Sequence, residues 1–135
     1  MVNYMSKVIL DSNFLFVPFQ LKIDIFKELD RLLGKAEPLV LTTTLWELEN
    51  VAKKRSQKIA KQASAALELA NKCEIVEAEK KLNESYDDVI LRTAKELNFA
   101  VATNDANLRK RLREAKVPVV YVRQKSYLEI EGLPQ

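Results

Sequence analysis

The sequence has no histidine, only two glycines and a single cysteine. Without histidine, imidazole-based catalytic triads and His-ligated metal sites are excluded. Two glycines leave no glycine-rich loop to wrap a nucleotide phosphate, which excludes the usual P-loop and dinucleotide-binding motifs. Cys73 alone makes neither an internal disulfide nor a cysteine-built zinc site. Carboxylates, hydroxyls, lysines and arginines remain, and these favour a carboxylate site for a hard cation such as Mg²⁺.

Long hydrophobic runs are also absent. No apolar stretch approaches the ~20 residues that cross a membrane. The first residues do not resemble a signal peptide, because Asp11 interrupts the short apolar run at 8–10. We therefore expect a cytoplasmic location and no membrane partner. The 135 residues, 47% hydrophobic and 30% charged, fit one globular domain over residues 1–135, with a C-terminal tail at about 124–135.

Positive charge is concentrated in two stretches, although the net charge is only +3. Residues 53–61 include five basic residues and no acid, and residues 109–125 include seven basic residues and one acid. Such stretches could follow a phosphate backbone, and solvated helix faces are the alternative. Within the second stretch, Arg109, Arg113 and Lys116 have the spacing of a single helix face.

Short apolar runs alternate with longer helical patterns along the chain. The runs predict strands at 7–10, 38–42, 74–77, 99–103 and 117–122, and the tail at 127–135 could add another. The helical patterns lie at 23–33, 45–52, 57–72, 85–97 and 106–115. We expect Thr43 and Thr44 to cap the second helix, and Ser85 to form a capping box with Asp88. This alternation predicts an α/β fold in three layers, with a mostly parallel sheet of about five strands between helices.

Acidic residues follow strands or begin helices at several places. Asp11 directly follows the first strand, and Asp105 follows the strand at 99–103. The carboxyl ends of parallel strands meet at one edge of a sheet, so we expect both at the same edge, where Glu47 and Asp87 could join them. Close carboxylates repel one another, and bound Mg²⁺ or Mn²⁺ would relieve that cost and activate a water. The alternative is that the aspartates cap helices and Glu47 is solvated.

Four short segments in order resemble the PIN-domain ribonuclease family. They are residues 9–15 around Asp11, 44–49 around Glu47, 87–94 from Asp87 and 101–105 ending at Asp105. The resemblance implies a Mg²⁺- or Mn²⁺-dependent endoribonuclease in which these four acids are both catalytic residues and metal ligands. It also implies secondary roles beside them for Asn13, Asp88, Thr103 and Asn104.

Residues 14–26 and 124–132 resemble the archaeal branch related to small-subunit rRNA-processing endonucleases. VapC toxins share the catalytic pattern, and a catalytically silent RNA-binding assembly factor is a further alternative. The resemblance implies RNA as a partner, contacted by Arg109, Arg113 and Lys116, together with an antitoxin or a ribosome-assembly partner. PIN domains commonly pair, and the large apolar side chains at 14–21 would support a homodimer if one core cannot bury them all.

Overall fold

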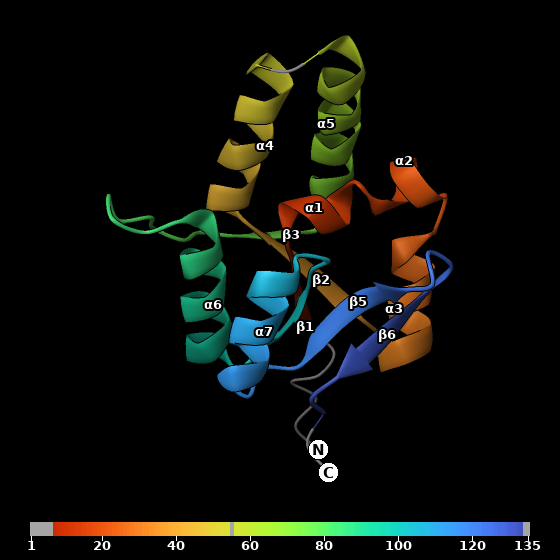
Figure 1. Cartoon of the computed structure of the whole chain (residues 1–135), viewed down its shortest axis with the longest axis vertical. Helices are drawn as coiled ribbons and strands as arrows, with labels where there is room; N and C mark the ends of the chain where they lie inside the picture. The colour runs from red at the N-terminus through yellow and green to blue at the C-terminus, as the bar shows by residue number, and fades with distance from the viewer. Residues whose placement is uncertain (1–6, 55, 134–135) are drawn as a thin grey trace.

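The computed structural model describes residues 7–54 and 56–133 (Figure 1). Arg55, in the first basic stretch, and residues 134–135 of the tail therefore lie outside the described residues. Six strands form one sheet in the order β3-β2-β1-β4-β5-β6. The strands are β1 (Lys7–Leu10), β2 (Glu37–Leu41), β3 (Glu74–Val76), β4 (Ala100–Ala102), β5 (Val119–Arg123) and β6 (Tyr127–Glu131). The helices are α1 (Ser12–Leu15), α2 (Val17–Leu21), α3 (Ile25–Leu33), α4 (Thr42–Lys54), α5 (Gln57–Ala70), α6 (Tyr86–Leu97) and α7 (Ala106–Glu114).

The sheet is parallel except for its last pair. β1 pairs with β2 on one side and with β4 on the other, and Ile9 lies opposite Leu39 and Val101. β5 and β6 are antiparallel, joined by a tight turn. The chain moves outward from β1 in both directions, so the strand order reverses between β1 and β4. Open sheets of this kind bind ligands beyond the carboxyl ends of the strands at that reversal.

Alternate residues of the buried strands point to opposite faces and build two cores. Val8 and Leu10 of β1 pack with residues of α1, α3, α4 and α5 on one face. Ile9 of the same strand packs with residues of α6 and α7 on the other. This arrangement confirms the three-layer α/β prediction. The α4–α5 hairpin projects beyond the carboxyl edge of the sheet (Figure 1).

Local signals place most helix starts. Ser85 and Asp88 form the expected capping box at α6, with each side chain accepting the other's backbone N–H. Asp24 accepts from the backbone N–H of Lys27 and caps α3. The expected cap at Thr43 or Thr44 is wrong, because β2 runs directly into α4 at Thr42 and both residues lie inside the helix. A cap residue precedes the helix, and here no residue lies between the end of β2 and the start of α4.

Two short helices and one strand extend the predicted architecture. The apolar stretch at 14–21 folds into α1 and α2, with Pro18 in the first turn of α2. Phe14, Leu15 and Val17 are buried, and Phe19 is 40% exposed. The core thus absorbs most of the side chains on which the expected dimer surface depended. The tail supplies β6, so the sheet has six strands rather than about five.

The outer border of β6 is covered by side chains of α3. Glu28 Oε1 accepts from the backbone N–H of Leu128 at 3.0 Å, and Arg31 donates to the Leu128 carbonyl at 2.8 Å. The same two side chains are joined to each other by a two-pronged hydrogen bond. α3 therefore satisfies one residue of the outermost strand as a neighbouring strand would.

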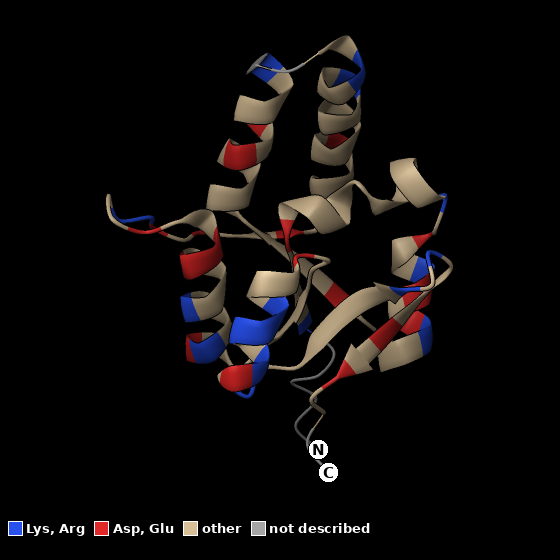
Figure 2. Cartoon of the chain, in the orientation of Figure 1, with Lys and Arg blue, Asp and Glu red and all other residues tan. Residues whose placement is uncertain are grey.

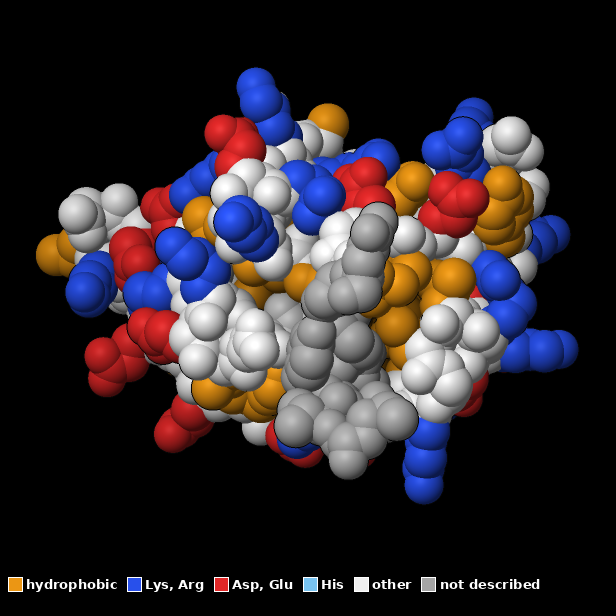
Figure 3. Space-filling model, turned by 90° about the horizontal axis from the view of Figure 1, so that it is seen from below, with side chains coloured by type: hydrophobic (Ala, Val, Ile, Leu, Met, Phe, Trp, Pro, Cys, Tyr) orange, Lys and Arg blue, Asp and Glu red, His pale blue; other side chains and the backbone are white. Residues whose placement is uncertain are grey.

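Charged side chains of both signs are mixed on the face at the amino ends of the strands (Figure 3). Over the described residues, no helix is long and apolar enough to pass through a bilayer.

Candidate active site

Asp11 lies at the reversal of the strand order and is almost fully buried. It follows β1, and its backbone N–H donates to the Ala102 carbonyl at 3.0 Å, which extends the pairing of β1 with β4. Asp11 Oδ1 accepts from the Ser12 backbone N–H at 2.8 Å. Asp11 Oδ2 accepts from the Thr103 hydroxyl at 2.7 Å and from Asn13 Nδ2 at 2.9 Å. Hydrogen bonds from the segment after β1 and from the segment after β4 therefore hold the Asp11 carboxylate in place.

Asn13 and Thr103 hold the two segments together around Asp11. The Thr103 hydroxyl accepts from the backbone N–H of Asp105 at 3.1 Å. Asn13 Oδ1 accepts from the backbone N–H of Asn104 at 3.0 Å. Asn104 is directed elsewhere, because its side-chain oxygen accepts from the Val122 N–H of β5 at 3.0 Å. Asn13 and Thr103 thus contact the central carboxylate, whereas Asn104 holds the loop after β4 to β5.

Glu47 lies one turn into α4 and is half-buried. Its Oε1 atom is buried and accepts no hydrogen bond from any residue that the structure describes. Burial raises the pKa of Glu47 to about 7, and the Asp11 and Asp87 charges add to the rise while the Ser12 side chain opposes it. The predicted alternative of a freely solvated residue is therefore wrong.

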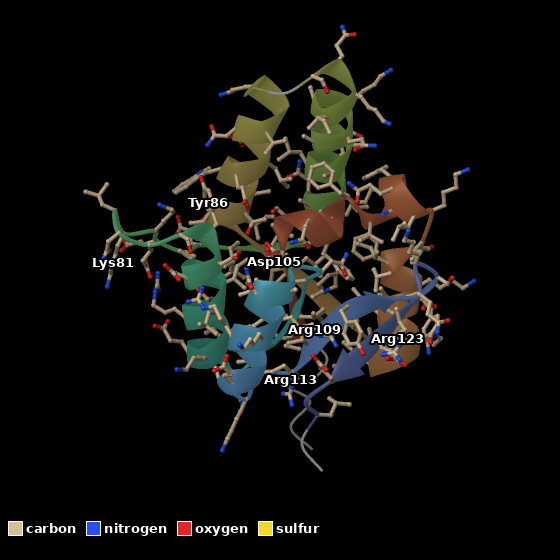
Figure 4. All side chains as sticks on the ribbon, viewed as in Figure 1. Lys81, Tyr86, Asp105, Arg109, Arg113 and Arg123 are labelled. Carbon is tan, nitrogen blue, oxygen red and sulfur yellow. The ribbon has the colours of Figure 1, made fainter. Side chains whose placement is uncertain are left out.

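Asp87 and Asp105 complete the group. Asp87 lies in the first turn of α6, where Ser85 rather than Asp87 is the cap. Burial raises the pKa of Asp87, the Asp105 charge raises it further, and Arg111 opposes the rise. Asp105 caps α7 by accepting from the Leu108 N–H at 2.8 Å. It is placed at the top of α7, below α1, in Figure 4.

The four carboxylates influence one another, and Asp11 is at the centre of that interaction. Burial raises the pKa of Asp11 to about 6, and the Asp87 and Asp105 charges raise it further against the hydrogen bonds from Thr103 and Ser12. None of the four carboxylates forms an ion pair in the described part of the chain. Acidic positions converge where α4, α1, α6 and α7 meet (Figure 2). The sheet therefore gathers negative charge without a basic partner.

The donor set suits a hard divalent cation. Carboxylate and hydroxyl oxygens are the ligands that Mg²⁺ and Mn²⁺ prefer, and the buried, unpartnered Glu47 Oε1 lacks the partner that a cation would supply. Among the described residues, however, no three acidic or cysteine side chains are arranged to hold an ion as they stand. The chemistry of the group nevertheless fits a cation.

Asp88 and the basic face of α7 have structural partners. Asp88 accepts from the Ser85 N–H and, through its other oxygen, from Arg111 at 2.7 Å. Arg109 bonds to Glu131 of β6 at 2.6 Å, and its guanidinium lies 3.6 Å from the centre of the Tyr121 ring. Arg113 is 4.0 Å from the same Glu131 carboxylate, and Lys116 lies beyond the end of the helix. Arg109 and Arg113 follow Asp105 down α7 in Figure 4, so the expected basic face exists but is partly neutralised.

Sequence reasoning did not assign Ser12 to the site. Its backbone N–H binds Asp11, and its side chain lowers the pKa of Glu47 against the effect of burial. Ser12 is the first residue of α1, which Asp11 caps, but a helix of four residues has no helical period by which the sequence could have shown this. That position directs the backbone N–H toward the capping carboxylate.

Comparison with known proteins decides the family. The profile described as "PIN like domain" matches residues 8–125. The chain belongs to the PIN-like domain family. The structure described as that of the PIN domain endonuclease Utp24 has a TM-score of 0.77 at 30% identity, and the match covers 94% of this chain and 92% of that one.

Two curated relatives of this PIN-like chain are RNA-related by name. Ribonuclease VapC4 of Methanocaldococcus jannaschii is 38% identical over 131 residues, which cover 96% of this chain and 99% of VapC4. The rRNA-processing protein FCF1 of Saccharomyces cerevisiae is 32% identical over 132 residues, which cover 95% of this chain and 65% of FCF1. The family resemblance seen in the sequence is confirmed, and both named groups are among the relatives.

Proposed function

We propose that this chain is an endoribonuclease that hydrolyses RNA phosphodiester bonds with divalent cations held by Asp11, Glu47, Asp87 and Asp105. The observation that carries the proposal is the group of four carboxylates that form no ion pair with any described residue, three of which have pKa values raised by burial and by neighbouring acids. An acid that only caps a helix, or that is only exposed to solvent, has no need of other carboxylates near it. The ribonuclease and endonuclease relatives support the reaction class.

The residues of the site have distinct parts in this proposal. Asp11 is held rigidly by Asn13 and Thr103, so it is the fixed oxygen donor around which a cation would bind. Glu47 and Asp87 face it from two helices and would complete the ligand set with Asp105. A bound Mg²⁺ or Mn²⁺ would polarise the phosphate and lower the pKa of an attacking water.

Ribosomal-RNA processing is the role we propose first, with a VapC-type toxin as the second candidate. The Utp24 fold match and the FCF1 relative favour processing. The VapC4 match, which spans nearly the whole of both chains, favours the toxin. The retained four acids argue against a silent assembly factor. We also propose an antitoxin or a ribosome-assembly protein as a partner, and a homodimer, which light scattering of the purified chain measures.

Cleavage of RNA with and without cations tests the proposal. Purified protein should cut RNA in Mn²⁺ or Mg²⁺ and stop when EDTA is added. Calorimetry should show Mn²⁺ binding that the Asp11→Asn variant loses. Undiminished cleavage in EDTA by protein free of contaminating nuclease would refute the proposal. Mapping the cut ends on total cellular RNA separates a single rRNA site from broader targets.

A further inference from the structure

Trp46 is an exposed aromatic residue at the border of the acidic site. It lies immediately before Glu47 on α4, it is 51% exposed, and it is the only tryptophan in the chain. Its side chain lines a pocket of about 590 Å³ formed by the start of α4 and residues 77–81. An indole left half-uncovered at a helix start offers a flat apolar face on a rigid support.

The wall opposite Trp46 is held in place from both ends. The Thr42 hydroxyl exchanges hydrogen bonds with the backbone of Ala78, at 3.1 and 3.2 Å. Arg92 of α6 donates to the Glu79 carbonyl at 2.7 Å and to the Glu84 carboxylate at 3.0 Å. The segment between β3 and α6 is therefore anchored on both flanking helices, and the pocket is a built feature of the fold.

A second aromatic ring lies beside this wall and next to another acid of the site. Tyr86 begins α6 and precedes Asp87, and the Lys80 ammonium is 5.5 Å from the centre of its ring. In Figure 4, Tyr86 lies at the top of α6, below the base of α4, with Lys81 further out on the segment that precedes α6. Each of the two aromatic residues is thus adjacent in the chain to a carboxylate of the site.

The charges around the pocket balance. Lys80 and Lys81 line it together with Glu77 and Glu79, which gives two charges of each sign. A balanced wall provides little net attraction for a phosphate backbone. Unpaired nucleic-acid bases stack on exposed aromatic rings, and such stacking needs no net charge.

We propose that Trp46 binds one unpaired base of the RNA by stacking, on the side of the carboxylates formed by α4 and α6. This proposal rests on the ribonuclease function proposed above and adds to that site a contact with one base of the substrate. A base held against the indole would position the neighbouring backbone at Glu47 and Asp87. Trp46 is therefore a positioning residue that acts on substrate outside the carboxylate group.

The single tryptophan makes stacking directly observable. Wild-type protein in EDTA is titrated with a short single-stranded RNA and with the same RNA annealed to its complement, and binding is followed in parallel by anisotropy of labelled RNA. We expect the single strand to quench the Trp46 emission and the duplex to leave it nearly unchanged. Bound single-stranded RNA with unaltered emission would overturn the proposal.

Variants at Trp46 distinguish the loss of stacking from the loss of an exposed apolar side chain. Trp46→Ala should weaken single-strand binding about tenfold, which corresponds to about 1.4 kcal/mol, and by the same factor at low and high salt. Trp46→Phe should recover most of the affinity because it retains a ring. Leu97→Ala, at a 43% exposed position at the far end of α6, serves as the matched control and should bind as wild type. Equal affinity of Trp46→Ala and wild type, or equal loss in Trp46→Ala and Trp46→Phe, would contradict the proposal.

The remaining outcomes distinguish the two proposals from each other. A blue shift of Trp46 emission that depends on protein concentration without RNA would mean that a second copy covers the ring, and would overturn the RNA assignment. Metal-dependent cleavage with unaltered emission would overturn stacking alone. Quenching by single-stranded RNA without any metal-dependent cleavage would overturn the nuclease function but retain the base contact.

Discussion

Seven acidic residues of this chain fall into two sets with opposite electrostatic behaviour. Glu28, Glu84, Asp88 and Glu131 each bond to an arginine, and the arginine or a backbone N–H holds each pKa below its ordinary value. At the carboxyl edge of the sheet, burial and neighbouring acids instead raise the pKa values of Asp11, Glu47 and Asp87. Ionisation stabilises the fold in the first set and opposes it in the second.

This difference shows which acids lower the stability of the fold when they are ionised. A surface acid acquires an arginine partner easily, as five acids among the described residues have done. The edge acids come from four elements and their charges raise the pKa values of Asp11, Glu47 and Asp87, and only Asp11 among them accepts hydrogen bonds from both a side-chain hydroxyl and a side-chain amide of the described residues. Charge that is left uncompensated in this way marks a functional site more strongly than acidity alone. The predictions below test the contrast, from the largest expected effect to the smallest.

Neutralising the central edge acid should have the largest effect. Asp11→Asn removes the charge of the carboxylate that Ser12, Asn13 and Thr103 hold by hydrogen bonds. We therefore expect metal-dependent RNA cleavage to fall by about 100-fold or more. Initial rates on a defined RNA at saturating Mn²⁺ measure the loss. Asp24→Asn is the matched control, because Asp24 also caps a helix and asparagine preserves capping. Similar rates for the two variants would deny Asp11 a special role.

The metal-free fold should become less stable as pH rises through the pKa values of the edge acids. A carboxyl with a raised pKa in the folded state binds its proton more tightly there than in the unfolded chain. Stability is therefore highest below the ordinary pKa near 4.5 and is lost as pH rises to about 7 for Glu47. We expect about 2 kcal/mol from this residue, and Glu47→Gln should remove that part of the pH dependence.

Urea unfolding in EDTA between pH 5 and 8 measures this effect. The arginine-paired acids serve as the internal reference, because their lowered pKa values place their stability change at more acidic pH. A wild-type profile that is flat over this range, or one that Glu47→Gln leaves unaltered, would contradict the assignment.

Asp105→Asn should have a smaller effect, which distinguishes a role of Asp105 as a metal ligand from a role as a helix cap. Asparagine caps α7 about as well as aspartate but lacks the charge that repels Asp11 and Asp87. Asp105→Asn should therefore stabilise the protein in EDTA by about 1 kcal/mol and gain less than wild type when Mg²⁺ or Mn²⁺ is added. Thermal melts of both proteins with and without metal decide it. An equal metal response would remove Asp105 from the ligand set.

The smallest effect concerns the arginines of α7. Replacing Arg109 and Arg113 with alanine should weaken RNA binding and flatten its salt dependence, although Glu131 already neutralises part of their charge. Glu131→Gln should act in the opposite direction, tightening binding and steepening the salt slope by about one unit. Lys95→Ala, on α6, controls for net charge. Identical slopes in all variants would mean that this face is only solvated.

The sequence was sufficient for the parts of the fold that repeat a strong local pattern. Wholly apolar strands, the capping box at Ser85 and the helical periods of α5 to α7 predicted the layers and the edge at which Asp11 and Asp105 lie. The two short helices after Asp11 were not predicted, because four or five residues are too few to show a helical period. The expected cap at Thr43 failed because the strand and helix join without a loop.

The site was predictable in its residue types and less so in its surroundings. Strand ends placed Asp11 and Asp105 at one edge of the sheet, because that position depends only on topology, whereas Glu47 and Asp87 were assigned with the help of the family resemblance. The unpartnered Glu47 oxygen, the Ser12 contribution and the Glu131 bond to Arg109 depend on which side chains meet across the fold. Contacts between residues 22 positions apart, as in the last case, leave no periodic trace in the chain.

The two borders of the sheet differ in whether they can be extended. At β6, Glu28 and Arg31 already occupy the backbone groups of Leu128 that an added strand would need. At the opposite border, β3 is only three residues long and leaves Ile75 39% exposed. The described sheet is thus closed to growth at Leu128. A peptide recruited by strand addition would therefore join at β3 rather than at β6.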